Sequence, residues 1–326
     1  MLSRVAHSIY WMTRYIERAE NIARFINVNL NLSLDFSADN GNQWQPIIMA
    51  SGDHTLFEKK HGFNFSPDKV IHFLSLDQDY ANSILSCVAA ARENARSVRE
   101  IISSEMWEQV NRFYLDLKDA ARTNLTGENP HKFFKIIMMR GHMFTGLLYT
   151  TMSHNEAFRF AMAGLLLERA DKTSRILDVK FFMLLPQPHE VNSPYDAVQW
   201  AAVLKSASAL ESYRKRFHRI VPKQVCDFLI FDTEFPRSIR HCLANAEKAL
   251  HKISGSPEGT VSNKAEKSLG RLRADIDYSD IEDVINIGMH EYLDALQIKI
   301  NNVGNDIHDT FFEVSSPSQT CSIQIQ

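Results

Sequence analysis

The chain has 326 residues, of which 44% are hydrophobic and 23% charged, a balance typical of a soluble globular protein. Its formal net charge of −3 argues against a general nucleic-acid-binding protein, which normally carries a basic surplus. Arg4, His7 and Arg14 interrupt the apolar pattern at the N-terminus, and apolar runs such as 181–185 are far shorter than a membrane span of ~20 residues. We therefore expect a cytoplasmic protein with neither a signal peptide nor membrane contacts.

The first predicted helix covers about residues 2–34. Its apolar residues recur every three or four positions and form one stripe that should face the core. Glu20 lies at the edge of this stripe, where it should be partly desolvated. The opposite arc is expected to face solvent, and it consists of Tyr10, Arg14, Glu17, Asn21 and Arg24.

Residues 35–65 are less regular and carry several glycine turn signals, and Ser66-Pro67 marks the start of a short helix. The next helix is predicted over about 80–102. On it Arg92, Arg96 and Arg99 form a stripe of like charges, with Glu93 and Glu100 nearby. Such a stripe favours an anionic ligand, or else it is an ordinary surface shielded by the two glutamates.

Further helix starts are indicated by Ser103-Ser104-Glu105, by Asn129-Pro130, and by Ser153 or Asn155, after which a long helix ends before Pro186. Ser193-Pro194 predicts a helix through Arg219, and Phe235-Pro236 opens another. Residues 279–282 form a predicted capping box that begins the last long helix. No strand-like alternation is sustained, so the fold class should be all-α, with one multi-helix domain over 1–314 and a disordered tail over 315–326.

One motif occurs twice. Residues 14–24 and 166–175 both contain an apolar residue, Glu-Arg-Ala, an acid and, four positions after the acid, an arginine. On a helix, an acid and an arginine four positions apart are neighbours, but each exposed pair is worth only about 0.2–0.5 kcal/mol. The repetition therefore needs another reason, either shared descent of two halves of the chain or a shared site.

Residue chemistry alone does not identify a reaction. The sequence contains no GxGxxG, P-loop, GxSxG or HExxH motif, and the Glu-x-x-His spacing at 58–61 lies in the irregular region. We expect no metal and no cofactor. The four cysteines show no CxxC spacing, which is typical of a reduced cytosolic protein, and they are Cys87, Cys226, Cys242 and Cys321.

These motifs resemble the alpha-E family of bacterial helical proteins. The resemblance covers nearly the whole chain, with a departure at 79–83, where family members tend to read Asn-Pro-Ser-Ser. It is carried by Met1-Leu2-Ser3-Arg4, Tyr10-Trp11-Met12, the Glu-Arg-Ala-Glu-Asn run at 17–21, Ala91-Arg92-Glu93-Asn94-Ala95-Arg96, 104–108, 167–175, Gln199-Trp200 and Phe235-Pro236-Arg237-Ser238. The resemblance implies a setting, because such proteins are typically encoded beside an ATP-grasp ligase-like protein and a transglutaminase-like protease.

Three functions remain open. The first is a non-catalytic helical partner of an ATP-grasp amidoligase in a peptide-synthesis or peptide-modification system. The second is an enzyme of that pathway with acid or base groups among the clustered glutamates, and the third is a self-assembling protein or a binder of anionic metabolites. The candidate binding residues are Arg14, Glu17, Arg18, Glu20, Arg24, Arg92, Glu93, Arg96, Arg99, Glu168, Arg169, Asp171 and Arg175.

Three expectations follow for the structure and its chemistry. The two motif helices should approach each other, with their acids in salt-bridge reach of Arg24, Arg175 or the arginine stripe. Removal of Glu20 should destabilise the protein more than removal of Glu17. The arginine-rich face should recognise a carboxylate or phosphate group, while the protein alone performs no ATP chemistry, since it has no phosphate-binding glycine loop.

Overall fold

The computed structural model describes residues 1–35, 44–123, 129–183 and 194–313. Within these ranges every regular element is a helix and there is no β-strand, so the predicted all-α fold class is confirmed. The expected disordered tail at 315–326 and the stretch after Pro186 lie outside the described residues.

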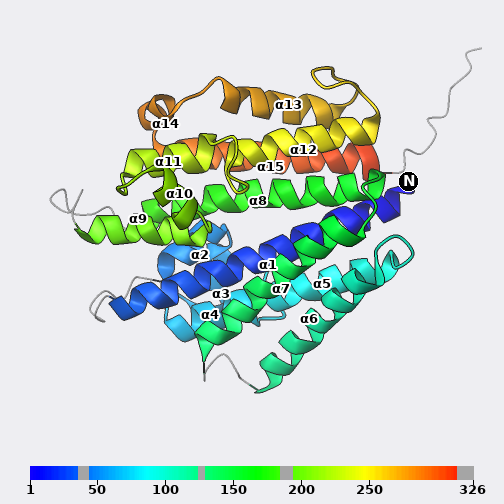
Figure 1. The fold of residues 1–326 in the computed structure, drawn as a ribbon. Coiled ribbons are helices and arrows are strands. Elements are labelled where there is room, and N and C mark those ends of the chain that lie inside the picture. The colour runs from blue at the N-terminus through cyan, green and yellow to red at the C-terminus, as the bar shows by residue number, and fades with distance from the viewer. Residues whose placement is uncertain (36–43, 124–128, 184–193, 314–326) are drawn as a thin grey trace, which may run out of the picture.

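Two long helices form the centre of the molecule (Figure 1). They are α1, Ser3–Asp35, and α8, Glu156–Met183, and they pack directly against each other. Most residues of α8 are buried around its whole circumference, as expected of a central helix. At Gly164 a Cβ atom would lie 2.4 Å from the carbonyl oxygen of Tyr10, so this glycine lets the two backbones come close together.

The segments between α1 and α8 cover one side of this pair. α5, Ile84–Ser97, and α7, Pro130–Thr151, pack on α1, and α6, Ser104–Thr123, packs on both of them. α2, Gln45–Ser51, lies against α8, and it is followed by two short helices, α3, His54–His61, and α4, Pro67–Ser75.

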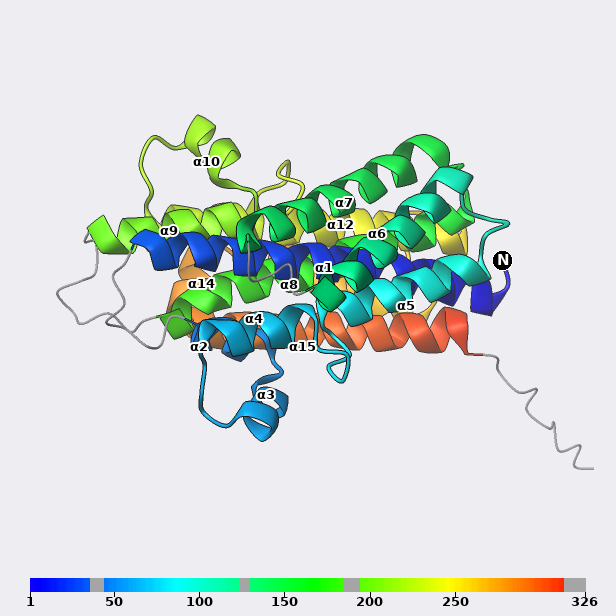
Figure 2. The same ribbon diagram turned by 90° about the horizontal axis from the view of Figure 1, so that it is seen from below.

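The segments after α8 cover its other side. α12, Ile239–Ser254, and α15, Met289–Ile307, pack on α8, and α13, Lys264–Asp277, lies over both (Figure 1). The remaining elements are α9, Pro194–Ser206, α10, Leu210–Arg216, α11, Pro222–Phe231, α14, Ile281–Ile287, and a π-helical turn, His308–Phe312, that packs on α1. Figure 2 shows α3 and α10 projecting from opposite sides of the bundle.

Several helix starts lie where the capping residues predicted them. α4 starts at Pro67, as Ser66-Pro67 predicts, and the side chain of Asn129 accepts the backbone N–H of Lys132 at 3.0 Å at the start of α7. Of the two predicted starts of α8, Asn155 is the right one, since its side chain accepts the N–H of Ala157 at 3.1 Å. The predicted helix over 80–102 is shorter, because Ser83 caps α5.

Other boundaries differ from the prediction because short breaks interrupt predicted long helices. The helix predicted from Pro194 through Arg219 is two helices, with Ser208 at a φ of 53° between them. The last long helix is likewise divided, at Gly288 with a φ of 102°. The irregular region 35–65 contains α2 and α3, and α13 was not anticipated.

Two predicted helix starts are displaced along the chain. The capping box consists of Asp280 and Asp283 rather than residues 279 and 282. The helix expected to open at Phe235-Pro236 begins later, at Ile239, after its cap Ser238. In both places a neighbouring residue with a side-chain acceptor caps the helix.

Candidate functional site

The polar arc of α1 is buried. Its members, Tyr10, Arg14, Glu17, Asn21 and Arg24, are at most 8% exposed, so the expectation of a solvent-facing arc is wrong. The helical period shows which residues share a face, but α8, α7 and the residues just before α12 decide whether that face is covered. They cover it here and supply the charges that match it.

Across the contact between α1 and α8, the arginine of each Glu-Arg pair binds the glutamate of the other pair. Arg18 donates from Nε to Glu168 Oε1 at 2.7 Å and from Nη2 to Oε2 at 3.0 Å. Arg169 donates from Nε and Nη2 to the two oxygens of Glu17, each at 3.0 Å. Each arginine thus makes a two-pronged ion pair with the glutamate of the other motif, which gives the repeated motif a structural reason. The expected approach of the two motif helices is confirmed.

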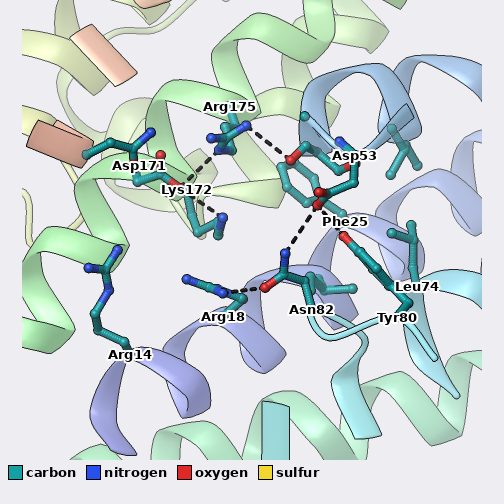
Figure 3. Close-up of a pocket in the computed structure, with 15 residues that line it drawn as sticks. Arg14, Arg18, Phe25, Asp53, Leu74, Tyr80, Asn82, Asp171, Lys172 and Arg175 are labelled. Atoms are coloured by element: carbon teal, nitrogen blue, oxygen red, sulfur yellow. Dashed lines mark hydrogen bonds and ion pairs between the residues drawn. The ribbon is translucent and has the colours of Figure 1, made fainter. Parts of the chain in front are cut away.

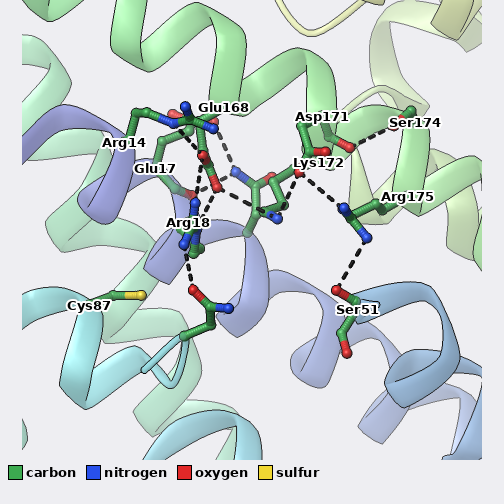
Figure 4. Close-up of polar contacts among 12 residues, drawn as sticks. Arg14, Glu17, Arg18, Ser51, Cys87, Glu168, Asp171, Lys172, Ser174 and Arg175 are labelled. Atoms are coloured by element: carbon green, nitrogen blue, oxygen red, sulfur yellow. Dashed lines mark hydrogen bonds and ion pairs between the residues drawn. The ribbon is translucent and has the colours of Figure 1, made fainter. Parts of the chain in front are cut away.

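Glu168 and Asp171 form the first of two charge clusters (Figure 4). Glu168, with no exposed side-chain surface, also accepts a hydrogen bond from Arg14 Nε at 2.9 Å. Asp171 accepts from Lys172 Nζ at 2.9 Å and from Arg175 Nε at 3.0 Å, both at Oδ2. Burial by itself would raise the pKa of Glu168, but Arg18, Lys172 and Arg14 outweigh it and hold the pKa well below its ordinary value.

Glu17 and Glu20 form the second cluster, which Arg237 holds together. Arg237 donates from Nη1 to Glu17 at 2.7 Å and from Nη2 to Glu20 at 2.6 Å. Arg24 pairs with Glu20 as well, and its own Nε has no hydrogen-bond partner among the described residues. Burial and the nearby positive charge of Arg237 lower the pKa of Arg24, which shows that cations crowd this end of the network.

Positive charge exceeds negative charge across the two clusters. Among the described residues, seven cations share four carboxylates through ion pairs of at most 3.5 Å. The cations are Arg14, Arg18, Arg24, Arg169, Lys172, Arg175 and Arg237, and the carboxylates are Glu17, Glu20, Glu168 and Asp171. Buried unbalanced charge is costly, so this surplus favours an anion nearby.

A polar cavity of about 200 Å³ opens beside the first cluster (Figure 3). All four cations of that cluster line it together with Asp171, and apolar side chains of α1, α2 and α4 complete its wall. The lining residues are Arg14, Arg18, Ile22, Phe25, Ile47, Ser51, Gly52, Asp53, Leu74, Tyr80, Asn82, Asp171, Lys172, Arg175 and Asn301. The surplus cations therefore adjoin a space that a small ligand could enter.

A hydrogen-bonded chain connects the cationic side of the cavity to Asp53. Arg18 Nη1 donates to Asn82 Oδ1 at 2.5 Å, and Asn82 Nδ2 donates to Asp53 Oδ2 at 3.3 Å. Tyr80 donates its hydroxyl to the same Asp53 oxygen at 2.5 Å. On the α8 side, Arg175 Nη1 donates to the backbone oxygens of Ala50 and Ser51, at 3.1 and 3.2 Å, which fixes the end of α2 against the cavity.

The arginine stripe, with Arg92 and Arg96 on α5 and Arg99 just after it, is not part of this network. Arg92 lies over the ring of Tyr114, with the guanidinium carbon 5.0 Å from its centre, and Arg99 lies 5.0 Å from the ring centre of Trp107. Arg96 is 65% exposed and pairs with Glu93. Arg92 and Arg99 therefore contribute to the contact with α6 by stacking on its aromatic rings, whereas Arg96 faces solvent.

Several site residues escaped sequence reasoning. Arg237 stands in the Phe-Pro-Arg-Ser run and Lys172 lies within the second motif, so both family-like segments carried a signal. Asp53 lies in the region expected to be irregular, and Tyr80 and Asn82 lie at the predicted start of the helix over 80–102. Nothing in their local sequence connects them to α1 or α8. Tertiary packing alone brings them to the cavity.

The described cysteines are not activated thiols. Burial raises the pKa of Cys87, Cys226 and Cys242 to about 12, so none of them is ionised near neutral pH. Among the residues that the structure describes, no group of three or more His, Cys, Asp or Glu side chains is arranged to hold a metal ion. None of the described helices has both the length and the apolar character needed to cross a membrane.

The chain is similar to much longer mycobacterial proteins. It is 22% identical to an uncharacterized protein of Mycobacterium bovis and 21% identical to one of Mycobacterium tuberculosis. Each match covers 94% of this chain but 36% of the relative, so the chain spans about a third of the length of these relatives. No solved structure matches it significantly.

The family assignment agrees with the geometry of the site. The Alpha-E family is described as a predicted alpha-helical domain with a conserved ER motif, and its model matches residues 1–312. This chain has two such Glu-Arg pairs, at 17–18 and 168–169. The arginine of each pair forms an ion pair with the glutamate of the other, which joins α1 to α8. On the length of this match, the chain belongs to the Alpha-E family.

Proposed function

We propose that this protein is a non-catalytic helical partner of an ATP-grasp amidoligase, and that it holds a carboxylate-bearing substrate in the cavity beside α1 and α8. The observation that carries this proposal is the surplus of cations at the cavity wall. The proposal places the protein in the cytoplasm, where such a ligase finds ATP, and in a peptide-synthesis or peptide-modification system.

The cavity offers donors suited to a carboxylate. Arg14 and Arg175 each use Nε to hold a buried acid, and neither Nη2 donates to a described residue. Lys172, at 13% side-chain exposure, adds an ammonium group to the same wall. Forked guanidinium donors and an ammonium group are the usual partners of carboxylates in proteins.

The same geometry makes an acid–base enzyme the weaker alternative. The pKa values of Glu17, Glu168 and Asp171 lie below their ordinary range, because paired arginines and lysine outweigh the effect of burial. A general acid or base works best with a pKa near the operating pH. These carboxylates therefore suit the positioning of cations better than proton transfer.

A surface suited to a protein partner lies on α7. Lys132, Lys135, Ile136, Met139 and Met143 lie on its exposed side. The sequence of α7 contains no Asp or Glu, so this face combines apolar side chains with positive charge only. It fits a ligase surface that is apolar at its centre and acidic at its rim.

The proposal is tested by adding this protein to the ATP-grasp protein encoded beside its gene and measuring ADP release with a carboxylate substrate. The protein alone should release no ADP, and its addition should increase the carboxylate-dependent rate of the ligase. Lys172→Met should weaken this effect, while Arg96→Ala, on the exposed stripe, should not. Equal stimulation by the Lys172→Met variant, or no stimulation by the unaltered protein, would contradict the proposal.

The α7 surface has its own test. Met139→Glu places a negative charge at the centre of the exposed face, where the side chain is 63% exposed, and it should weaken association with the ligase without changing the unfolding midpoint. Ile298→Glu on α15, where the side chain is 53% exposed, is the matched control. Equal association of both variants would show that the partner binds elsewhere.

A further inference from the structure

We infer that the ligand of the cavity carries an ammonium group as well as a carboxylate, and is a free amino acid. This inference rests on the proposed function, since the same cavity must accept the carboxylate. It adds a second recognition element, which consists of the carboxylates of Asp53 and Asp171.

Asp53 presents an acceptor to the cavity. Its Oδ2 accepts hydrogen bonds from Tyr80 and Asn82, whereas its Oδ1 accepts none from the described residues. In Figure 3, Asp53 and Tyr80 lie on the opposite side of the cavity from Arg14 and Arg18. The cavity thus has Arg14 and Arg18 on one side and Asp53, with Arg175 near it, on the other.

Asp171 supplies an independent observation. It is 4% exposed and lines the cavity, and its Oδ2 is shared by Lys172 and Arg175. Its Oδ1 is fully buried and has no hydrogen-bond partner in the part of the chain that the structure describes. Buried acceptors are nearly always satisfied, so this oxygen marks unused acceptor capacity beside the cavity.

The size and the apolar wall of the cavity define the rest of the ligand. A volume of about 200 Å³ is below the range of about 300–1,000 Å³ that holds drug-sized molecules. Ile22, Phe25, Ile47 and Leu74 form an apolar part of the wall. This space fits one residue with an apolar side chain, whose charged groups reach the cations on one side and Asp53 on the other.

The test begins with a thermal-shift measurement of the full chain with each of the twenty amino acids. The amino acid that raises the unfolding temperature most is then titrated calorimetrically, beside its N-acetyl derivative and its amide. The amino acid should bind about tenfold or more tightly than either derivative, because each derivative lacks one charge-assisted contact.

Asp53→Asn distinguishes the two recognition elements. Asp53 precedes α3 but its side chain makes no cap hydrogen bond, so the substitution should leave the fold intact. The variant should bind the amino acid and its N-acetyl derivative equally, because the contact with the ammonium group is lost. Asp79→Asn, on a residue with an 88% exposed side chain outside the cavity, should keep the preference.

The outcomes separate the inference from the proposed function. Equal binding of the amino acid and its N-acetyl derivative to the unaltered protein overturns the inference and leaves carboxylate binding in place. Equal binding of the amino acid and its amide overturns the proposed carboxylate site. No thermal shift with any amino acid at millimolar concentration overturns the inference, and carboxylate-dependent ADP release then still decides the proposed function.

Discussion

Replacement of Glu17 by alanine should destabilise the protein strongly, although the sequence placed this residue on a solvent-facing arc. Glu17 is 1% exposed and accepts hydrogen bonds from Arg169, Arg237 and Asn21. Its removal leaves two guanidinium groups, each with 11% side-chain exposure, without one of their carboxylates. Breaking a buried ion pair from one side costs about 3–5 kcal/mol, because a buried charge loses its partner.

The matched control is Glu93→Ala on α5. Glu93 pairs with Arg96, but the two side chains are 50% and 65% exposed, so the loss should be about 0–1 kcal/mol. Glu20→Ala should resemble Glu17→Ala, because Glu20 is also 1% exposed and binds Arg237. The sequence predicted that loss of Glu20 destabilises the protein more than loss of Glu17. The structure instead leads us to expect nearly equal losses of stability.

Equilibrium unfolding in urea, followed by circular dichroism, measures these differences. The double variant Glu17→Leu/Arg169→Met should be less destabilised than the sum of its single variants, because it removes both charges and keeps apolar volume. If Glu17→Ala unfolds within about 1 kcal/mol of Glu93→Ala, the buried network contributes no more than an exposed pair, and the reasoning is wrong.

Three further predictions follow from the same packing. The stability that the buried glutamates contribute should stay level from neutral pH down to about 4.5, the ordinary pKa of a glutamate, and fall below it, because their lowered pKa values stabilise the fold only while they are ionised. Urea titrations at several pH values check this, and Glu168→Gln should flatten the fall below pH 4.5. Gly164→Ala should destabilise the protein, since its Cβ would lie 2.4 Å from a backbone oxygen, whereas Gly146→Ala, with nothing within 4 Å, should stabilise it by roughly 0.5–1 kcal/mol in thermal unfolding. The three described cysteines should resist iodoacetamide in the native protein and react in urea, as peptide mass spectrometry would show; rapid native labelling of any of them would contradict their burial.

The sequence alone determined the fold class, the central helix α1 and the family. Glycine and proline are too sparse for frequent breaks, and apolar residues recur with a helical period, so helices were the only consistent interpretation. The repeated Glu-Arg pair was also visible, because it lies within one helix each time. Breaks such as those at Ser208 and Gly288 were not visible, since the flanking helical pattern continues through them.

Only the tertiary structure decided which charges are buried and what they contact. A helical period gives the angle between Glu17 and Ile16 around α1, but not whether another helix covers either side. The partner of Glu17 lies 152 positions away at Arg169, and a second partner lies 220 positions away at Arg237. Asp53 reaches the cavity from a short loop between α2 and α3. Contacts between segments so far apart depend on how whole helices pack, which local periodicity and capping do not specify.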